Sequence, residues 1–157
     1  MTSNQKTTYK MNTPVTMHFS IEELYASDTA KRLGIDNTPS VQKMIHLVYL
    51  AAYVLEPLRV AMNRPIHISS GYRCEKLNKA VGGVYNSQHL KGQAVDIDIE
   101  GDMEFGKKVF NYIKDHLPFD QLIWEHNKSG TYWVHVSFVF PDFGRNRKQV
   151  IGNLLKK

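Results

Sequence analysis

The chain contains a single cysteine, Cys74, among its 157 residues. An internal disulfide and a multi-thiolate zinc cluster are both excluded within this chain, because each needs more than one thiol. Histidine and carboxylate side chains are therefore its candidate metal ligands. We interpret Cys74 as a small buried side chain rather than as a nucleophile.

We also recognise no secretion signal, membrane-spanning run, internal repeat or low-complexity segment in the sequence. A length of 157 residues with 42% hydrophobic composition suits one compact domain with a core. We expect a flexible polar arm at residues 1–13, a folded domain at residues 14–144 and a basic tail at residues 145–157. We interpret that tail as a solvated segment, the alternative being a docking patch. Its basic residues are Arg145, Arg147, Lys148, Lys156 and Lys157.

Positive charge is in excess, with a formal net charge of +5 at pH 7. This balance favours an anionic partner such as cell-wall polymer, nucleic acid or a carboxylate-bearing peptide. Nucleic acid is the least favoured of these, because the sequence has no recognisable reader motif and no interleaved basic and aromatic platform.

The order of the predicted elements indicates an α+β fold, with helices packed on one face of an antiparallel sheet. A capping box at residues 20–23 begins the first helix, and apolar residues at helical spacing mark a long core helix that we expect to bend at Pro57. The pattern predicts helices at residues 20–34, 41–62, 75–81 and 103–116, and strands at residues 65–70, 93–99, 120–124 and 132–140.

The strand at residues 93–99 alternates with a period of two, so Asp96 and Asp98 share one face while its aliphatic residues point to the core. His89 lies just before this strand, and His135 lies on the later strand at residues 132–140. If the two strands are neighbours, His135 and Asp96 meet across the sheet. Two imidazoles and a carboxylate with a fourth position open are what a catalytic zinc requires, although the spacing His-x6-Asp is a weak pattern and H-E-x-x-H is absent.

The remaining histidines are interpreted as structural or exposed. His46 and His116 lie within predicted helices, and His67 lies on the polar side of a predicted strand. His18 has no partner in view, and His126 is expected to be exposed near a hairpin turn, with approach to the site as the alternative.

Several motifs taken together resemble the zinc D-Ala-D-Ala carboxypeptidase family of the hedgehog-type fold, in its cell-wall and phage-lysin branch. The resemblance covers roughly residues 18–140, and the combined set is specific although each fragment alone is not. The motifs are Phe19-Ser20-Ile21-Glu22-Glu23-Leu24, Leu33-Gly34-Ile35-Asp36-Asn37-Thr38-Pro39, Ser70-Gly71-Tyr72-Arg73, Leu77-Asn78-x-Ala80-Val81-Gly82-Gly83, Ser87-x-His89-x-x-Gly92-x-Ala94-x-Asp96 and Trp133-Val134-His135-Val136-Ser137.

The resemblance implies one zinc ion held by His89, Asp96 and His135. It also implies that Arg73 lies near the zinc, where its cationic fork suits a peptide carboxylate or the oxyanion of a tetrahedral intermediate. Two neighbours of the first ligand have open roles. Ser87 and Gln88 hydrogen-bond the substrate, position His89 or stabilise the loop locally.

The general base is where the sequence departs from the family pattern. Many members of the family have an acidic residue three positions before the last histidine ligand, but here that position is Tyr132. Glu125 is our first candidate for the base, because it ends the preceding strand of the predicted hairpin. Asp98 is the second candidate, since it shares the face of Asp96. Tyr132 and Trp133 can line the substrate groove, although packing is the more ordinary role.

The resemblance implies a zinc metallopeptidase that hydrolyses peptidoglycan stem peptides, either as a D,D-carboxypeptidase or as an endopeptidase. The alternative is a non-catalytic zinc-containing module of the same fold that binds cell wall or protein. The expected partners are the peptidoglycan peptide and an anionic cell-wall polymer, with no nucleic acid and no membrane span. We expect cytoplasmic synthesis with release to the wall, as for a phage protein, or secretion with a leader that is missing here.

Overall fold

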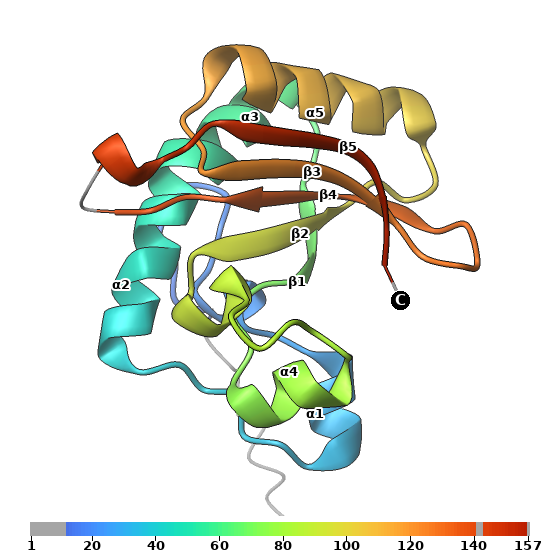
Figure 1. The fold of residues 1–157 in the computed structure, drawn as a ribbon. Coiled ribbons are helices and arrows are strands. Elements are labelled where there is room, and N and C mark those ends of the chain that lie inside the picture. Colours follow the sequence, from blue (N-terminus) through green and yellow to red (C-terminus); the bar gives the residue numbers. More distant parts are fainter. Residues whose placement is uncertain (1–11, 141–142, 157) are drawn as a thin grey trace, which may run out of the picture.

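A five-stranded sheet forms the centre of the protein, and its strands follow the order β1-β2-β4-β3-β5 (Figure 1). The computed structural model describes residues 12–140 and 143–156. β1 to β4 pair antiparallel, whereas β5 runs parallel to β3, so the sheet is mixed. The strands are β1 His67–Ser70, β2 Ala94–Asp98, β3 Gln121–His126, β4 Tyr132–Ser137 and β5 Gln149–Leu155.

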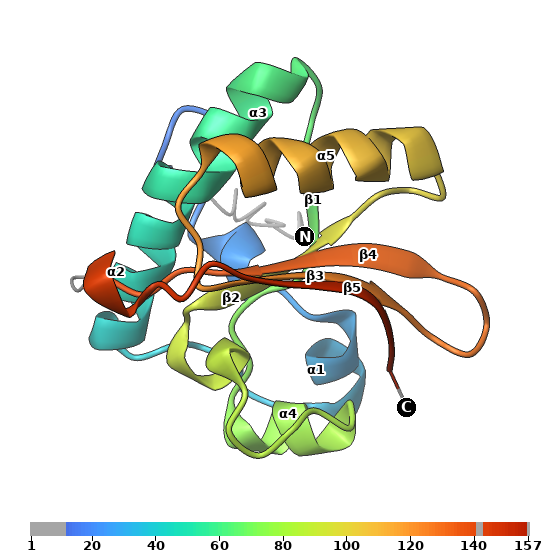
Figure 2. The ribbon, with the colours of Figure 1, turned by 45° about the horizontal axis from the view of Figure 1, so that its top comes forward.

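Helices lie on both sides of this sheet, with α3 and α5 over one face and α1 and α4 on the other side (Figure 2). The predicted α+β class is confirmed, but the helices are not confined to one face of the sheet. The helices are α1 Asp28–Leu33, α2 Val41–Leu50, α3 Glu56–Met62, α4 Glu75–Ala80 and α5 Met103–His116, with short turns at η1 Glu22–Leu24, η2 Ala51–Leu55, η3 Gln88–Lys91 and η4 Phe143–Arg145.

The long core helix is one helical segment, Val41–Met62, made of α2, the π-helical turn η2 and α3. The π turn accommodates Pro57, which has no N–H to donate, at the start of α3. By length and composition alone this segment is apolar enough to cross a membrane. We interpret it as the core helix, because one stripe of it is fully buried. That stripe is Leu47, Leu50, Ala51, Val54, Leu55 and Leu58.

The first predicted helix, at residues 20–34, is wrong as a single element. The chain forms η1 and then a separate helix, α1, because Ser27 is extended and its Oγ accepts the Ala30 N–H as a new N-cap. Half of the predicted capping box is present, since Ser20 N donates to Glu23 Oε1 at 2.7 Å.

The alternation predicted around Asp96 is confirmed in β2. Val95, Ile97 and Ile99 are fully buried in the core between the sheet and the helices, and Asp96 lies on the opposite face. β2 pairs with β4 in a register that places Asp96 directly opposite His135. The core that fixes the sheet therefore also fixes which side chains meet on its other face.

The predicted basic tail at residues 145–157 is wrong for most of its length, because Gln149–Leu155 form β5. Asp120, which is 2% exposed, holds this segment to the body of the protein. Arg147 donates to its carboxylate from Nε at 3.0 Å, from Nη2 at 2.7 Å and from the backbone N–H at 2.9 Å. At the other end of the chain, residues 1–11 of the predicted arm lie outside the described residues, and Thr13 already bonds to Glu22.

The Asp120 anchor predicts a pH-dependent contribution to stability. Burial raises the pKa of Asp120, but hydrogen bonds from Arg147 and Gln88 outweigh it and hold the pKa below its ordinary value. Because the folded pKa is depressed, the contribution is present above the unfolded value of about 4 and is lost as pH falls through the folded pKa. At pH 7 we expect Asp120→Asn to lower the free energy of unfolding by about 1 kcal/mol or more.

Urea unfolding of both proteins between pH 7 and pH 3, with metal chelated, measures this effect. The difference between them should shrink below about pH 4. A difference that stays constant with pH contradicts the assignment.

Candidate metal centre and cleft

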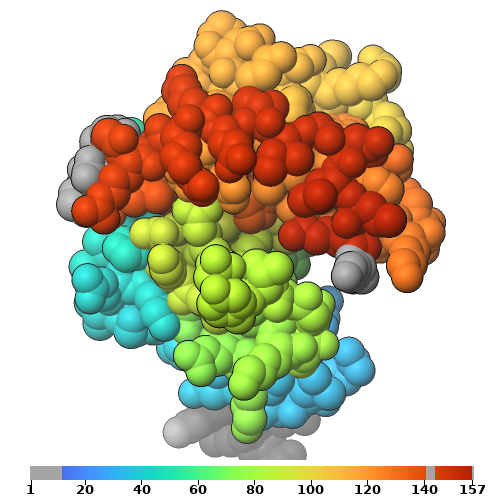
Figure 3. Space-filling model, viewed as in Figure 1, coloured from blue at the N-terminus to red at the C-terminus, as the bar shows by residue number. Residues whose placement is uncertain are grey.

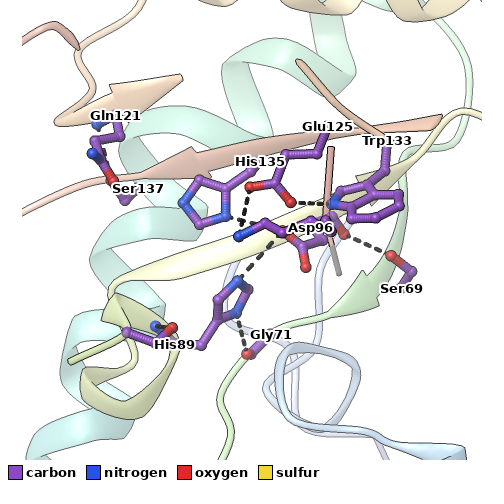
Figure 4. Close-up of polar contacts among 11 residues, drawn as sticks. Ser69, Gly71, His89, Asp96, Gln121, Glu125, Trp133, His135 and Ser137 are labelled. Carbon is purple, nitrogen blue, oxygen red and sulfur yellow. Dashed lines mark hydrogen bonds and ion pairs between the residues drawn. The ribbon is translucent and has the colours of Figure 1, made fainter. Parts of the chain in front are cut away.

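Three ligand-type side chains converge on one point of the sheet: His89 from η3, Asp96 from β2 and His135 from β4 (Figure 4). Their ligand atoms all lie within 4.8 Å of one another. Asp96 Oδ1 lies 3.0 Å from His135 Nδ1 and 3.3 Å from His89 Nε2. The structure thus brings together the three residues that the sequence analysis named as metal ligands.

The orientation of His89 is fixed by its neighbours. Its Nδ1 donates to the Gly71 carbonyl at 2.8 Å, which leaves Nε2 directed at Asp96 (Figure 4). Ser87 Oγ accepts the His89 N–H at 3.2 Å and begins η3, and Gly92 ends η3 with φ +70°. A backbone carbonyl on the second nitrogen is the usual way in which a protein fixes the tautomer of a metal-binding histidine.

The protonation states in this cluster suit a metal. Burial lowers the pKa of His89, which keeps its imidazole neutral. Burial raises the pKa of Asp96, but His89 and His135 outweigh it and hold this carboxyl ionised well below its usual range. Neutral imidazole and ionised carboxylate are the forms that bind divalent metals.

The donor set fits zinc. Tetrahedral zinc with bonds of about 2.0–2.1 Å separates neighbouring ligand atoms by about 3.3 Å. The two distances from Asp96 Oδ1 to the imidazole nitrogens are 3.0 and 3.3 Å, so one ion can join the three atoms with little rearrangement. Two imidazoles and one carboxylate leave a fourth position for water or substrate, as in catalytic zinc sites.

The cluster opens into a cleft of about 680 Å³. The cleft lies between the C-terminal strand and the α4–η3 segment, where the space-filling view shows a hollow (Figure 3). Its lining also includes Arg73, Glu125 and Trp133. A peptide-sized ligand therefore has access to the metal-binding atoms from this side.

Glu125 enters the cleft from β3, directly opposite Trp133 on β4. Its side chain is 2% exposed. One oxygen, Oε2, accepts the Trp133 indole N–H at 2.7 Å, and the other, Oε1, lies 3.3 Å from Lys156 Nζ. Burial, together with the charge of Asp96, raises the pKa of Glu125. A carboxylate with this environment, in the same cleft as the three candidate metal ligands, suits proton transfer near neutral pH.

Asp98 is placed less favourably. Its Oδ1 accepts the Glu100 N–H at 2.8 Å at the end of β2, and Asp98 is not among the described residues that line the cleft. The face that it shares with Asp96 therefore does not bring it to the cleft.

Arg73 lines the cleft, and its backbone is bonded to that of a candidate ligand, since its N–H donates to the His89 carbonyl at 3.1 Å. Burial lowers the pKa of Arg73, against the opposing effect of Asp96 and Glu125, both of which are near enough to act on its charge. Its buried Nε has no hydrogen-bond partner among the described residues. Arg73, a residue that lines the cleft, thus keeps one buried N–H donor without a described partner.

The two neighbours of His89 differ in what they offer a ligand. Ser87 uses its hydroxyl to begin η3. Gln88 donates from Nε2 to Asp120 Oδ2 at 2.9 Å, and its Oε1 has no partner within the described part of the chain. The geometry supports a positioning role for Ser87, and it leaves one buried acceptor of Gln88, which lines the cleft, without a described partner.

The other histidines lie outside the cluster. His18 does have a partner, Glu56 at 3.0 Å, and His67 pairs with Glu100 at 3.0 Å. His46 contacts the Lys91 carbonyl, and His116 and His126 pack on Tyr112 and Tyr132 respectively. Cys74 is half-buried and caps α4, so its expected burial is only partial.

The C-terminal segment contributes to the cleft, which the sequence pattern did not predict. Arg147, Leu154, Leu155 and Lys156 all line it. The apolar pairs at residues 150–151 and 154–155 were the available signal for a strand, but the basic residues around them favoured the interpretation as a tail.

The chain is similar to a known protein family. The family model described as Peptidase M15 matches residues 17–137. No curated protein matches the chain. The matched region includes the three clustered ligands and Glu125, and it ends at the last residue of β4, before β5 begins.

A metal-binding measurement tests the cluster. We expect the purified chain to bind about one zinc ion, and His135→Ala to weaken zinc binding by more than about 100-fold, because one of three protein ligands is removed. Elemental analysis after dialysis, together with competition against a chromophoric chelator, gives both quantities. His116→Ala is the matched control, since His116 packs on Tyr112 in α5. Unchanged zinc content in His135→Ala would contradict the ligand assignment.

Proposed function

The chain belongs to the Peptidase M15 family, a family of zinc peptidases, and we propose that it hydrolyses peptide bonds in peptidoglycan stem peptides. The observation that carries this proposal is the presence of Glu125 and Arg73 in the same cleft as the His89, Asp96 and His135 cluster. A cluster that served stability alone would not need a buried carboxylate beside it, nor an arginine whose buried Nε has no partner among the described residues.

His89, Asp96 and His135 would hold the zinc ion. Bound there, zinc supplies Lewis-acid polarisation of the scissile carbonyl and lowers the pKa of water toward neutrality. Glu125 accepts the proton of the attacking water at a carboxylate oxygen and passes it to the leaving amine. The Trp133 indole N–H, at 2.7 Å from Oε2, restrains the carboxylate in the cleft while it does so.

Arg73 binds the negative charge of the substrate. Its unused Nε–H and fixed fork suit either a peptide carboxylate or the oxygen that becomes negative as the carbonyl is attacked. The net charge of +5 also favours an anionic substrate, and the stem peptide carries carboxylates. A cell-wall polymer is the expected anionic partner of the remaining basic surface.

The absence of an acid at position 132 supports the alternative of a non-catalytic module, and the position of Glu125 argues against it. Tyr132 stacks with His126 at a ring-centroid distance of 4.9 Å and packs on Trp124, so it is a packing residue of the hairpin. Glu125, on the adjacent strand, supplies a buried carboxylate to the cleft instead.

Replacement of the base tests the mechanism. We expect Glu125→Gln to retain zinc and to reduce kcat by about 100-fold or more, because the amide cannot accept the proton. Asp98→Asn is the matched control, also a carboxylate-to-amide change on this sheet, and should keep near-normal turnover. Near-normal turnover of Glu125→Gln, or a large loss in Asp98→Asn, would transfer the role of base away from Glu125.

Digestion of purified peptidoglycan tests the substrate and identifies the bond. New amino and carboxyl ends should form with the zinc-loaded protein and should not form after chelation, since the chemistry needs the ion. Mass spectrometry of the fragments distinguishes release of a terminal D-Ala from cleavage within the stem or cross-bridge. Binding to peptidoglycan without any new ends would favour the non-catalytic module.

A further inference from the structure

The C-terminal strand β5 lies outside the residues 17–137 that the family model matches, yet it reaches the cleft. Lys156, the residue after β5, places Nζ 3.3 Å from Glu125 Oε1. The Lys156 side chain is 44% exposed, whereas that of Glu125 is 2% exposed. A cation at the edge of the cleft therefore reaches a carboxylate buried within it.

We propose that Lys156 is a positioning residue for Glu125, which it holds in the cleft together with the indole N–H of Trp133. This inference rests on the proposed function, in which Glu125 is the base. It adds to that function a residue supplied from beyond the matched part of the chain.

The contacts of the carboxylate show why a second partner matters. Oε2 has a well-formed hydrogen bond from Trp133, whereas Oε1 has no hydrogen bond among the described residues apart from the ion pair with Lys156. Glu125 is buried and shares the cleft with a second carboxylate, Asp96. A buried carboxylate oxygen without a partner is costly, and a like charge nearby adds repulsion. Lys156 offsets both and restrains the carboxylate from rotating out of place.

Backbone hydrogen bonds at both ends of β5 fix the position of Lys156. Its N–H donates to the His126 carbonyl at 2.7 Å, directly after the pairing of β5 with β3. At the start of β5, Gln149 N donates to the Asp120 carbonyl at 2.9 Å. Both ends of the strand are thus bonded to β3 or the residue before it.

A β-bulge sets the final direction of the strand. The register between β3 and β5 shifts between Ile123 and Glu125, and Asn153 adopts a positive φ of 58° at that point. An extra residue in one strand bends the strand and re-aims the side chains that follow it. The bulge at Asn153 therefore precedes Lys156, the residue that contacts Glu125, by three positions.

The first test reads the geometry without activity. The sequence has two tryptophans, so the indole 15N–1H resonances of Trp133 and Trp124 can be assigned by single substitutions. In zinc-loaded protein we expect Lys156→Met to shift the Trp133 resonance in the same sense as Glu125→Gln, with Trp124 nearly unchanged. Lys156→Arg should lie close to wild type, and Lys114→Met, an exposed lysine on α5, is the control for loss of one charge. No shift of Trp133 in Lys156→Met overturns the proposal.

The second test is kinetic. Lys156→Met should lower kcat by about tenfold with KM and zinc affinity unchanged, and Lys156→Arg should recover most of the loss. In the Glu125→Gln background, Lys156→Met should have no further effect, because Lys156 acts only through Glu125. Multiplicative effects in the double variant, or an unchanged kcat in the single one, overturn the proposal. Failure of the proposed function is a different result: the wild-type protein would not hydrolyse the substrate, while the Trp133 shift would still report the contact.

Discussion

The register between β2 and β4 is the constraint on which the site depends. It places Asp96 directly opposite His135, while the flanking pairs Val95 with Val136 and Ile97 with Val134 face the core and are fully buried. Because side chains alternate along a strand, a slip of either strand by one residue would move its aliphatic side chains to the cleft and its candidate ligand into the core. The free energy that fixes the metal-binding geometry therefore comes from apolar packing on the opposite face of the sheet, and not from the ligands themselves.

His89, the third candidate ligand, is held in place by a turn rather than by a strand. Gly71 accepts from the ring of His89, and the N–H of Arg73 donates to the His89 carbonyl, so the turn after β1 holds η3 at two points. The same turn is also held by η1, because Tyr72 N donates to the Leu24 carbonyl. The turn packs so closely on that carbonyl that a Cβ at Gly71 would overlap it. The turn thus couples the placement of a metal ligand to that of the cation beside it, which explains why a short segment before α4 carries so much of the site.

Sequence reasoning succeeded where the local pattern and the packing agree. Alternation in residues 93–99 predicted the face of Asp96, periodicity predicted α5 at Met103–His116, and the family resemblance named the three residues that the structure brings together. The strand β5 was not predicted, because its residues are mostly exposed and include Gly152 and Asn153. They therefore show no alternation of apolar and polar side chains. That strand is held by the buried carboxylate of Asp120 and by pairing with β3, which are long-range interactions that no local pattern records.

The missing acid at position 132 and the unexpected strand are connected through Glu125. A carboxylate at position 132 would come from β4, the strand that carries His135, whereas Glu125 comes from the next strand and bonds across the hairpin to Trp133. This arrangement leaves the far oxygen of Glu125 facing the edge of the sheet, where β3 would have exposed backbone groups if β5 were absent. β5 satisfies that edge and brings Lys156 to the same oxygen. If Glu125 is the base, it depends on a neighbour beyond β3, and the residues that line the cleft extend past the end of the family match at residue 137.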